Sequence, residues 1–363
     1  MSFNQYTWDL YKQTTIGIEM IKYFSDAGGY VLFKDYCPYA NFIPEDLYND
    51  WLENIYCYGV SDYDHPSSLE EAKDLYISLI TLGIRVEGQQ WLPANDFKNM
   101  LGIIQPMSYV LSQFAPEYFF PYLFLCRIFE LNKIADFFNI DLPNIPKRTD
   151  YKGRCMYYWE LCEVFYLFRK ENGLSPADLW SFLYDFAPNN LPSEKIDMPK
   201  PSQVWFIGGR LYQEDKSLES KFWQSSPETK KGDILVHYET SPISAITCIE
   251  ISLTDGVIDP LFRYYGCIYI GNRINIPHIT LKELQTDEYF FKHPLVRKNF
   301  QGVNGWSVNS ENYSELLRMI KTKGFDIEVL PKLYAPTLPK DVIIEYEHDV
   351  EQQLLEPLLN SMG

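Results

Sequence analysis

The chain has 363 residues, of which 46% are hydrophobic and 22% charged, so intrinsic disorder is excluded as its main state. This length predicts two globular domains, each able to bury its own core. The net charge of -17 excludes a protein that coats DNA indiscriminately, because such a protein would repel the phosphate backbone.

The acidity is unevenly distributed along the chain. Residues 1–198 contain 15 Lys and Arg against 27 Asp and Glu, a net charge of -12. Residues 199–332 contain 16 against 16, and residues 333–363 contain 1 against 6, which gives net charges of 0 and -5. The neutral middle segment is therefore the part expected to approach nucleic acid.

Several classes of site and location lack their usual sequence signals. No apolar run approaches the roughly 18 residues of a membrane span, and the N-terminus lacks the basic start and apolar stretch of a secretory signal, which predicts a cytoplasmic protein without a membrane partner. The seven cysteines are scattered and never spaced as CxxC. No GxxxxGK(S/T), GxGxxG, HExxH or GxSxG motif occurs. We therefore expect no disulfide framework, metal or cofactor.

Residues 1–190 carry helical spacing and predict an all-helical domain. Overlapping capping boxes at 67–71 predict a helix that runs to about Leu82, and Ser175 followed by Pro176 predicts another. The stretches 118–138 and 155–168 are apolar on all sides, so we expect buried central helices there. The many aromatic residues of this acidic domain are interpreted as core packing rather than as a platform for bases.

The positions of the prolines predict helix ends and a domain boundary. The tripeptide Phe-Ala-Pro occurs at 114–116 and 186–188, and each copy predicts the end of a helix, because proline restricts the residue before it. Residues 188–202 contain four prolines among polar residues. They predict a boundary between domains.

After this boundary the pattern changes to short strands with interleaved helices. Short β-branched and aromatic runs predict strands at 203–207, 233–238, 243–251 and 264–270. A capping box at 280–283 and a segment from Ser310 to Thr322 predict helices. The predicted fold class is α+β, with a compact mixed β-barrel at 199–332 and a C-terminal helix at 333–363.

The order of features from Val204 to Gly324 resembles the EVE domains of the PUA-like superfamily, which are related to the YTH readers of methylated adenine. A strand with Trp205 precedes a helical turn at 222–225 and a strand that ends at Tyr238. The segment 293–302, HPLVRKNFQG, stands where the family has a polar loop before a closing helix. The resemblance implies a pocket that takes one flipped, modified base, typically in DNA.

The resemblance also implies roles for individual residues. Aromatic faces that sandwich a flipped base contribute on the order of 1 to 3 kcal/mol each, and amide side chains read its polar edge. The base pocket would be formed by Trp205, Trp223, Ser225, Tyr238, Asn299 and Gln301. The two tryptophans and Tyr238 would be its aromatic walls, Ser225 a small polar group beside them, and the two amides would read the base edge. The phosphates flanking the flipped nucleotide would be bound by Lys292, Arg297 and Lys298.

Alternative interpretations stay open for several of these residues. Trp205 is either a wall or a core residue beneath the pocket. Asn299 and Gln301 either read the base edge or bond the turn at Gly302. An acidic insertion at 213–220 and the pair Tyr264 and Tyr265 depart from the family pattern and leave the third wall unassigned.

The C-terminal segment 341–363 is an acidic amphipathic pattern that predicts a helix. It resembles the first helix of PD-(D/E)xK restriction nucleases, with Glu351 at the matching position. That class holds Mg²⁺ on carboxylates from later strands, so we expect no cleavage by this chain alone. Either a longer polypeptide or a nuclease partner completes the site, or the helix packs on the first domain.

Three functions follow as hypotheses. The first is a non-enzymatic reader of modified DNA that serves a modification-dependent restriction or phage defence system, with the helical domain as scaffold or partner contact. The second is a protein that binds modified RNA or tRNA. The third is a sensor whose pocket takes a free nucleotide.

Overall fold

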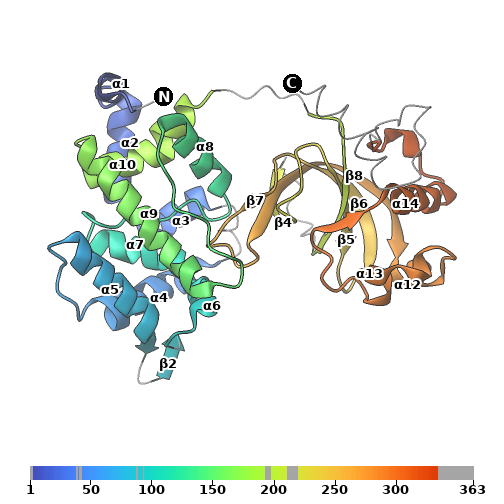
Figure 1. The fold of residues 1–363 in the computed structure, drawn as a ribbon, viewed down its shortest axis with the longest axis horizontal. Helices are drawn as coiled ribbons and strands as arrows, with labels where there is room; N and C mark the ends of the chain where they lie inside the picture. Colours follow the sequence, from blue (N-terminus) through green and yellow to red (C-terminus); the bar gives the residue numbers. More distant parts are fainter. Residues whose placement is uncertain are drawn as a thin grey trace, which may run out of the picture.

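The computed structural model describes residues 3–37, 40, 43–86, 89–92, 94–192, 198–210 and 220–333. The fold is mixed α/β, with an N-terminal helical region followed by a strongly curled sheet (Figure 1). The helical region contains α1 (Gln5–Tyr11), α2 (Thr15–Asp26), α3 (Gly29–Tyr36), α4 (Glu45–Ile55), α5 (Leu69–Leu82), α6 (Phe97–Met100), α7 (Ile104–Phe114), α8 (Ile128–Phe138), α9 (Tyr151–Glu171), α10 (Pro176–Ser181) and α11 (Ala187–Asn190), two π-helical turns, η2 (Tyr56–Val60) and η3 (Phe182–Phe186), and a hairpin of β1 (Ile84–Val86) and β2 (Gln89–Leu92).

The capping signals are confirmed. Helix α5 begins after Ser68, whose side chain accepts the Glu71 N–H, and α10 has a complete capping box between Ser175 and Asp178. The predicted central helix at 155–168 lies within α9, which buries Trp159 completely. The β1–β2 hairpin was not predicted.

The expectation of one helix over 118–138 is wrong for its first half. Helix α8 begins only at Ile128, and the buried chain before it is non-helical. Its backbone N–H groups donate to side chains from elsewhere: Tyr122 to the Ser108 hydroxyl, Leu123 to the Tyr184 hydroxyl and Cys126 to the Asp259 carboxylate. Pro121 interrupts a helical hydrogen-bond ladder, and these side chains satisfy the buried groups in its place.

The two Phe-Ala-Pro tripeptides differ in their effect. The first ends a helix as predicted, since α7 stops at Phe114. The second does not, because the helical path continues through η3 into α11, where Pro188 is in the first turn. Pro188 comes shortly after the π-helical turn η3, and such a turn accommodates an interruption of the regular helical hydrogen-bond ladder.

The second region is a seven-stranded sheet in the order β4-β8-β6-β5-β3-β9, with β7 paired to β8. Among the strand pairs within the described residues, β3 and β5 run parallel and the others antiparallel. The elements of this region are β3 (Val204–Gly209), β4 (Ser220–Gln224), β5 (Ile234–Glu239), β6 (Ala245–Ser252), β7 (Val257–Ile258), β8 (Gly266–Thr280), α12 (Leu281–Thr286), η4 (Phe290–Lys292), α13 (Pro294–Arg297), β9 (Trp306–Val308), α14 (Ser310–Thr322) and η5 (Ile327–Val329).

The predicted strands correspond to β3, β5, β6 and the first part of β8, and the predicted helices correspond to α12 and α14. The helical turn expected at 222–225 is wrong, because these residues belong largely to strand β4, which pairs with β8. Strands β7 and β9 were not predicted. The acidic insertion at 213–220 and the C-terminal segment 341–363 lie almost wholly outside the described residues.

The curled sheet has two buried faces. One face packs against α12, α13 and α14 through a cluster that includes Val204, Phe206, Leu295 and Leu316. The other face encloses a smaller cluster of Trp205, Ile207, Leu235, Ile268 and Ile270, against which Trp223 packs. Trp223 of β4 reaches His237 of β5, with ring centroids 4.7 Å apart, although β8 and β6 lie between these strands. The second face is therefore the interior of the curl.

The loop after β7 joins the sheet to the helical region (Figure 1). The buried Asp259 accepts the backbone N–H of Cys126 from the helical region, together with those of Leu261 and Phe262. Arg154 of α9, which is 1% exposed, donates to the carbonyls of Pro260 and Phe262. Because these polar groups are buried and paired, the two regions meet in a specific contact.

This contact predicts a pH dependence of stability. Burial raises the pKa of Asp259 to about 6, although three backbone N–H groups and the charge of Arg154 favour its ionisation. The folded protein then holds this proton more tightly than the unfolded chain, so Asp259 favours the folded state below about pH 4 and loses that contribution as the pH rises through 6. Between pH 7.5 and 5.5 the free energy of unfolding of the wild type should rise by about 1 kcal/mol relative to Asp259→Asn. Urea titrations at the two pH values measure this, and parallel changes in both proteins would contradict it.

No helix within the described ranges combines the length and the apolar character needed to cross a membrane. The apolar residues fall into separate clusters. The largest contains residues from Trp8 to Ala187 together with Leu261 from the loop after β7, and two others lie between Val204 and Leu330. Leu261 thus packs into the core of the helical region, beside the polar contacts of Asp259 and Arg154.

Candidate functional site

A cleft of about 900 Å³ lies at one end of the curled sheet. Its walls come from the ends of β3, β4 and β5, the start of β8 and the loop between α13 and β9, with one residue from the helical region. The lining residues are Arg148, Gly208, Gln224, Ser225, Ser226, Pro227, Thr240, Tyr264, Tyr265, Gly266, Asn299, Phe300, Gln301, Gly302, Val303, Asn304 and Gly305. This volume lies in the range of about 300 to 1,000 Å³ that small-molecule sites occupy.

The loop 299–305 has an unusual backbone. Asn299 and Phe300 both have positive φ, 50° and 58°, and Gly302 and Gly305 follow at 73° and 76°. Positive φ is uncommon for a bulky residue such as phenylalanine. The Phe300 ring stacks on Tyr238 with centroids 4.0 Å apart and an interplanar angle of 3°, which holds the loop in this conformation. Strained backbone of this kind concentrates at functional sites.

Asn304 connects this loop to the interior of the curl. Its Oδ1 accepts the Gly208 N–H at 2.8 Å and the Trp223 indole N–H at 3.3 Å, and its Nδ2 donates to Gln224 at 3.4 Å. Gly305 beside it is needed for close approach, since a Cβ there would lie 2.5 Å from the Ser226 nitrogen. The loop, β3 and β4 are thereby held together at the cleft.

The cleft offers both polar groups and aromatic faces. Ser225 is buried, its hydroxyl lies 3.0 Å from that of Thr229, and the Asn299 Oδ1 accepts from Gln285 at 3.0 Å. Gln301 is exposed. Among the aromatic residues that line the cleft, Phe300 is buried and Tyr264 is 48% exposed, with its ring against Phe262 at 5.5 Å. Tyr264 therefore presents an accessible aromatic face.

The structure brings together only part of the predicted base pocket. Ser225, Asn299 and Gln301 line the cleft, and Trp223 contacts it through Asn304. Trp205 lies in the interior of the curl, 5% exposed, with its indole N–H donating to Asp233 at 2.9 Å. Tyr238 is 3% exposed and faces the helices on the other side of the sheet. Neither lines the cleft, so both take positions of core residues rather than of walls.

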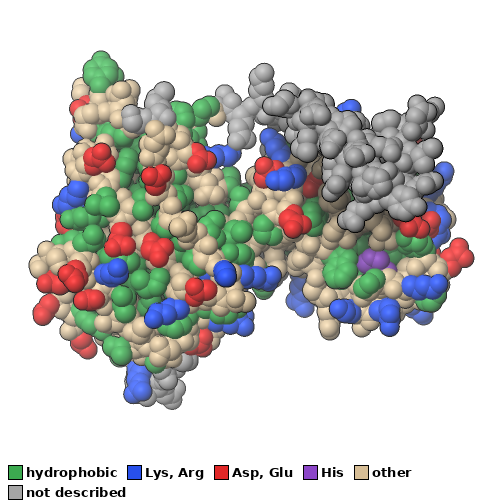
Figure 2. All heavy atoms as spheres, in the orientation of Figure 1, with side chains coloured by type: hydrophobic (Ala, Val, Ile, Leu, Met, Phe, Trp, Pro, Cys, Tyr) green, Lys and Arg blue, Asp and Glu red, His purple; other side chains and the backbone are tan. Residues whose placement is uncertain are grey.

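The charge around the cleft differs from that of the whole chain. Of the described residues that line it, Arg148 alone carries a charge, and none is Asp or Glu. Lys292, Arg297 and Lys298 are exposed on η4, α13 and the position after it, directly before the cleft loop. Figure 2 shows Lys and Arg side chains along the lower edge of the sheet region, over α12 and α13. An anionic ligand would meet no carboxylate among the described residues of the lining.

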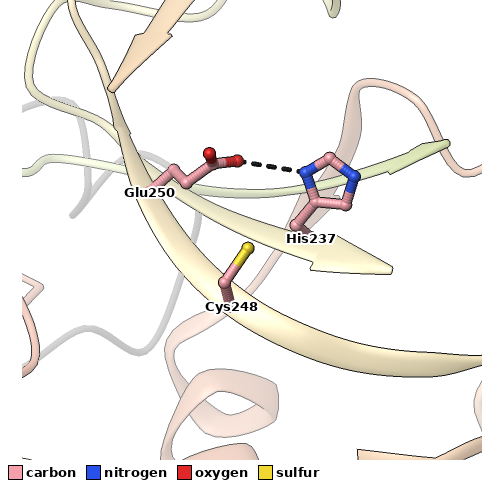
Figure 3. Close-up of side chains that lie close together, drawn as sticks. All are labelled: His237, Cys248 and Glu250. Atoms are coloured by element: carbon pink, nitrogen blue, oxygen red, sulfur yellow. Dashed lines mark hydrogen bonds and ion pairs between the residues drawn. The ribbon is translucent and has the colours of Figure 1, made fainter. Parts of the chain in front are cut away.

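A second cluster lies buried on the inner face of the neighbouring strands β5 and β6 (Figure 3). The Glu250 Oε2 accepts from His237 Nδ1 at 3.0 Å, and Oε1 accepts from Arg273 at 2.8 Å. Burial disfavours the carboxylate, but the hydrogen bonds and charges of His237 and Arg273 hold the pKa of Glu250 below its ordinary value of 4.5. The His237 ring also packs edge-on against Trp223. The cluster thus supports the tryptophan that contacts the cleft.

The same cluster contains metal-binding side-chain types. The ligand atoms of His237, Cys248 and Glu250 lie within 4.8 Å of one another, and all three residues are buried. The His237 Nε2 has no hydrogen-bond partner among the described residues. However, both Glu250 oxygens are already bonded, and burial raises the pKa of the Cys248 thiol to about 12, which disfavours the thiolate that metals bind. The described geometry is that of an ion-paired network.

The cleft residues that sequence reasoning did not assign to the pocket include Asn304, Tyr264 and Arg148. Asn304 lies between two glycines in the segment 302–305, a turn signal that was available, whereas Tyr264 was noted only as a departure from the family pattern. Arg148 had no local signal, because it belongs to the helical region and reaches the cleft only through the tertiary fold.

No family model and no curated protein matches the chain. Two solved structures resemble part of it. An NMR structure of Rpa0253 from Rhodopseudomonas palustris has 13% identity and a TM-score of 0.29, covering 33% of this chain and 94% of that one. The structure of a hypothetical protein from Leishmania major has 11% identity and a TM-score of 0.28, covering 34% of this chain and 98% of that one.

Proposed function

We propose that the protein recognises modified bases in DNA by taking one flipped base into the cleft at the end of the curled sheet. In this proposal the sheet region is a PUA-like barrel of the EVE type, and the protein acts in the cytoplasm. It serves a modification-dependent restriction or phage defence system, in which a nuclease domain or subunit supplies the cutting.

One observation carries the proposal: a cleft of about 900 Å³ combines neutral hydrogen-bonding groups and an exposed aromatic face, and none of its described lining residues is Asp or Glu, within a protein of net charge -17. A base needs an aromatic face to replace stacking and amide or hydroxyl groups to read its edge. Tyr264 offers the face, and Ser225, Asn299 and Gln301 offer the polar groups. Lys292, Arg297 and Lys298 are the proposed contacts to flanking phosphates.

Binding is proposed without catalysis. Among the described residues, the group of His, Cys, Asp or Glu side chains close enough to hold a metal is the His237, Cys248 and Glu250 cluster. It is buried, and none of its members lines the cleft. Metal-dependent cleavage of DNA requires ions that contact the phosphate directly.

The test compares a duplex that carries one 5-methylcytosine, 5-hydroxymethylcytosine or N6-methyladenine with unmodified duplex, single strand and RNA of the same sequence. One modified duplex should bind about fourfold or more tightly than the unmodified one, since burying a methyl group contributes about 0.8 kcal/mol. With Mg²⁺ present the duplex should stay uncut. Preference for modified RNA or for a free nucleotide would favour those functions instead, and equal binding of all duplexes would contradict the proposal.

A further inference from the structure

The cleft is completed by a residue from outside the sheet region. Arg148 lies in the segment between α8 and α9 of the helical region, yet it lines the same cleft as Tyr264 and Asn299. Its side chain is exposed. The helical region therefore takes part in the candidate site as well as supporting it.

The backbone around Arg148 is held in place by contacts to the cleft wall. The Arg154 guanidinium donates to the Arg148 carbonyl at 2.9 Å, and the Tyr265 hydroxyl donates to the Pro146 carbonyl at 2.5 Å. The same Arg154 lies over the Tyr265 ring, 5.2 Å from its centroid, and bonds two carbonyls of the loop after β7. One buried arginine thus ties the Arg148 segment to the loop between β7 and β8, which supplies Tyr264 and Tyr265 to the cleft wall.

The electrostatic setting favours an anion at Arg148. Among the described residues that line the cleft, Arg148 carries a positive charge and none carries a negative charge. The nearest acidic neighbour along the chain, Asp150, accepts the Gly153 N–H as the N-cap of α9 and lies outside the lining. The guanidinium fork of arginine matches the geometry of a phosphate, to which it donates two parallel hydrogen bonds.

We infer that Arg148 binds the phosphate of the nucleotide whose base occupies the cleft, so that the helical and sheet regions together form the binding site. This inference rests on the proposed function and extends it to a nucleotide ligand. The base contacts the sheet region and its phosphate contacts the helical region. A ligand without phosphate would gain nothing from Arg148.

The experiment uses three variants of the full chain: Arg148→Gln, Arg148→Lys and the control Lys147→Gln, which removes the neighbouring exposed charge outside the lining. Probes are the modified and unmodified duplexes, the nucleoside of the preferred modified base and its 5′-monophosphate. Arg148→Gln should weaken duplex and monophosphate binding about three- to tenfold and leave the nucleoside unchanged. It should also make the fall of the logarithm of the DNA-binding constant with the logarithm of salt concentration less steep, by about 0.9 in slope. Lys147→Gln should change binding less than twofold, and Arg148→Lys should restore part of the loss.

The outcomes separate the two proposals. If the wild type binds modified and unmodified duplex equally but Arg148→Gln alone weakens both, the phosphate contact stands and the reading of modifications fails. If modified duplex is preferred but Arg148→Gln and Lys147→Gln behave alike, the reader stands and the contact at Arg148 is refuted. If neither DNA nor the monophosphate binds the wild type, both proposals are refuted.

Discussion

Replacing Glu250 by alanine should lower the free energy of unfolding by about 3 kcal/mol, the lower end of the range for a broken buried ion pair, because it leaves the buried His237 and the half-buried Arg273 without their carboxylate. Glu250 is 2% exposed, and its two oxygens accept from His237 and from Arg273. The Arg273 guanidinium would then lose its ion pair, and the buried His237 ring would lose its hydrogen-bond acceptor. Urea unfolding, followed by circular dichroism, measures the change.

Two controls make this result interpretable. Glu250→Gln keeps the shape and one acceptor, so its loss should be smaller than that of alanine. The pKa of Glu250 is lowered in the folded protein, so its contribution is present above about pH 4.5 and is lost as the pH falls below that value. A loss below 1 kcal/mol for Glu250→Ala would contradict the network. Zinc that copurifies with the wild type and disappears in Cys248→Ser would show a metal site in its place.

The local signals in the sequence were reliable where a helix begins. The serine and threonine caps at Ser68, Ser175 and Thr280 each accept the N–H three residues later. Such signals depend only on neighbouring residues, and for that reason they can be read without knowing the fold. The same reasoning failed for 118–127, because its backbone is bonded by Ser108, Tyr184 and Asp259, which are distant in the sequence.

The site was predictable only in part, for a related reason. Strand alternation separates Trp205 from Phe206 and His237 from Tyr238, but it identifies no core face when both faces are buried. Two of the three candidate walls, Trp205 and Tyr238, were therefore placed without knowledge of which way their side chains pointed. The segment 293–302 was located through its resemblance to a family, whereas the continuation of the loop to Gly305 and the contact of Asn304 with Trp223 emerged only from the fold.

A chain of contacts connects the buried network of His237, Glu250 and Arg273 to the cleft. His237 packs on Trp223, Trp223 bonds Asn304, and Asn304 bonds the backbone at Gly208. A buried ion-paired cluster costs desolvation energy, and one attested use of such clusters is to fix a unique arrangement. Here it positions the tryptophan that holds the cleft loop against β3. Variants of the network should therefore be compared with variants whose side chains face the ligand directly.

Tyr264→Ala is such a variant, and it should weaken binding of the preferred modified duplex about 5- to 150-fold, which corresponds to the roughly 1 to 3 kcal/mol of one base-stacking face. Tyr264 is the exposed aromatic residue among those that line the cleft, and its ring is oriented by Phe262. Since 48% of its surface is already in solvent, the melting temperature should change little. Tyr264→Phe should keep most of the affinity, because it retains the aromatic face.

The matched control is Tyr58→Ala, which removes a tyrosine of nearly equal exposure, 45%, from the helical region and outside the cleft lining. Fluorescence anisotropy with labelled duplex and a thermal melt of each variant measure affinity and stability side by side. Equal affinities for Tyr264→Ala and Tyr58→Ala would show that no base stacks at Tyr264. A Tyr264→Ala protein that melts several degrees lower would instead assign this tyrosine to the contact with Phe262, and the stacking face would have to be sought elsewhere in the cleft. Loss of affinity with an unchanged melt is the combination that only a ligand-facing ring produces.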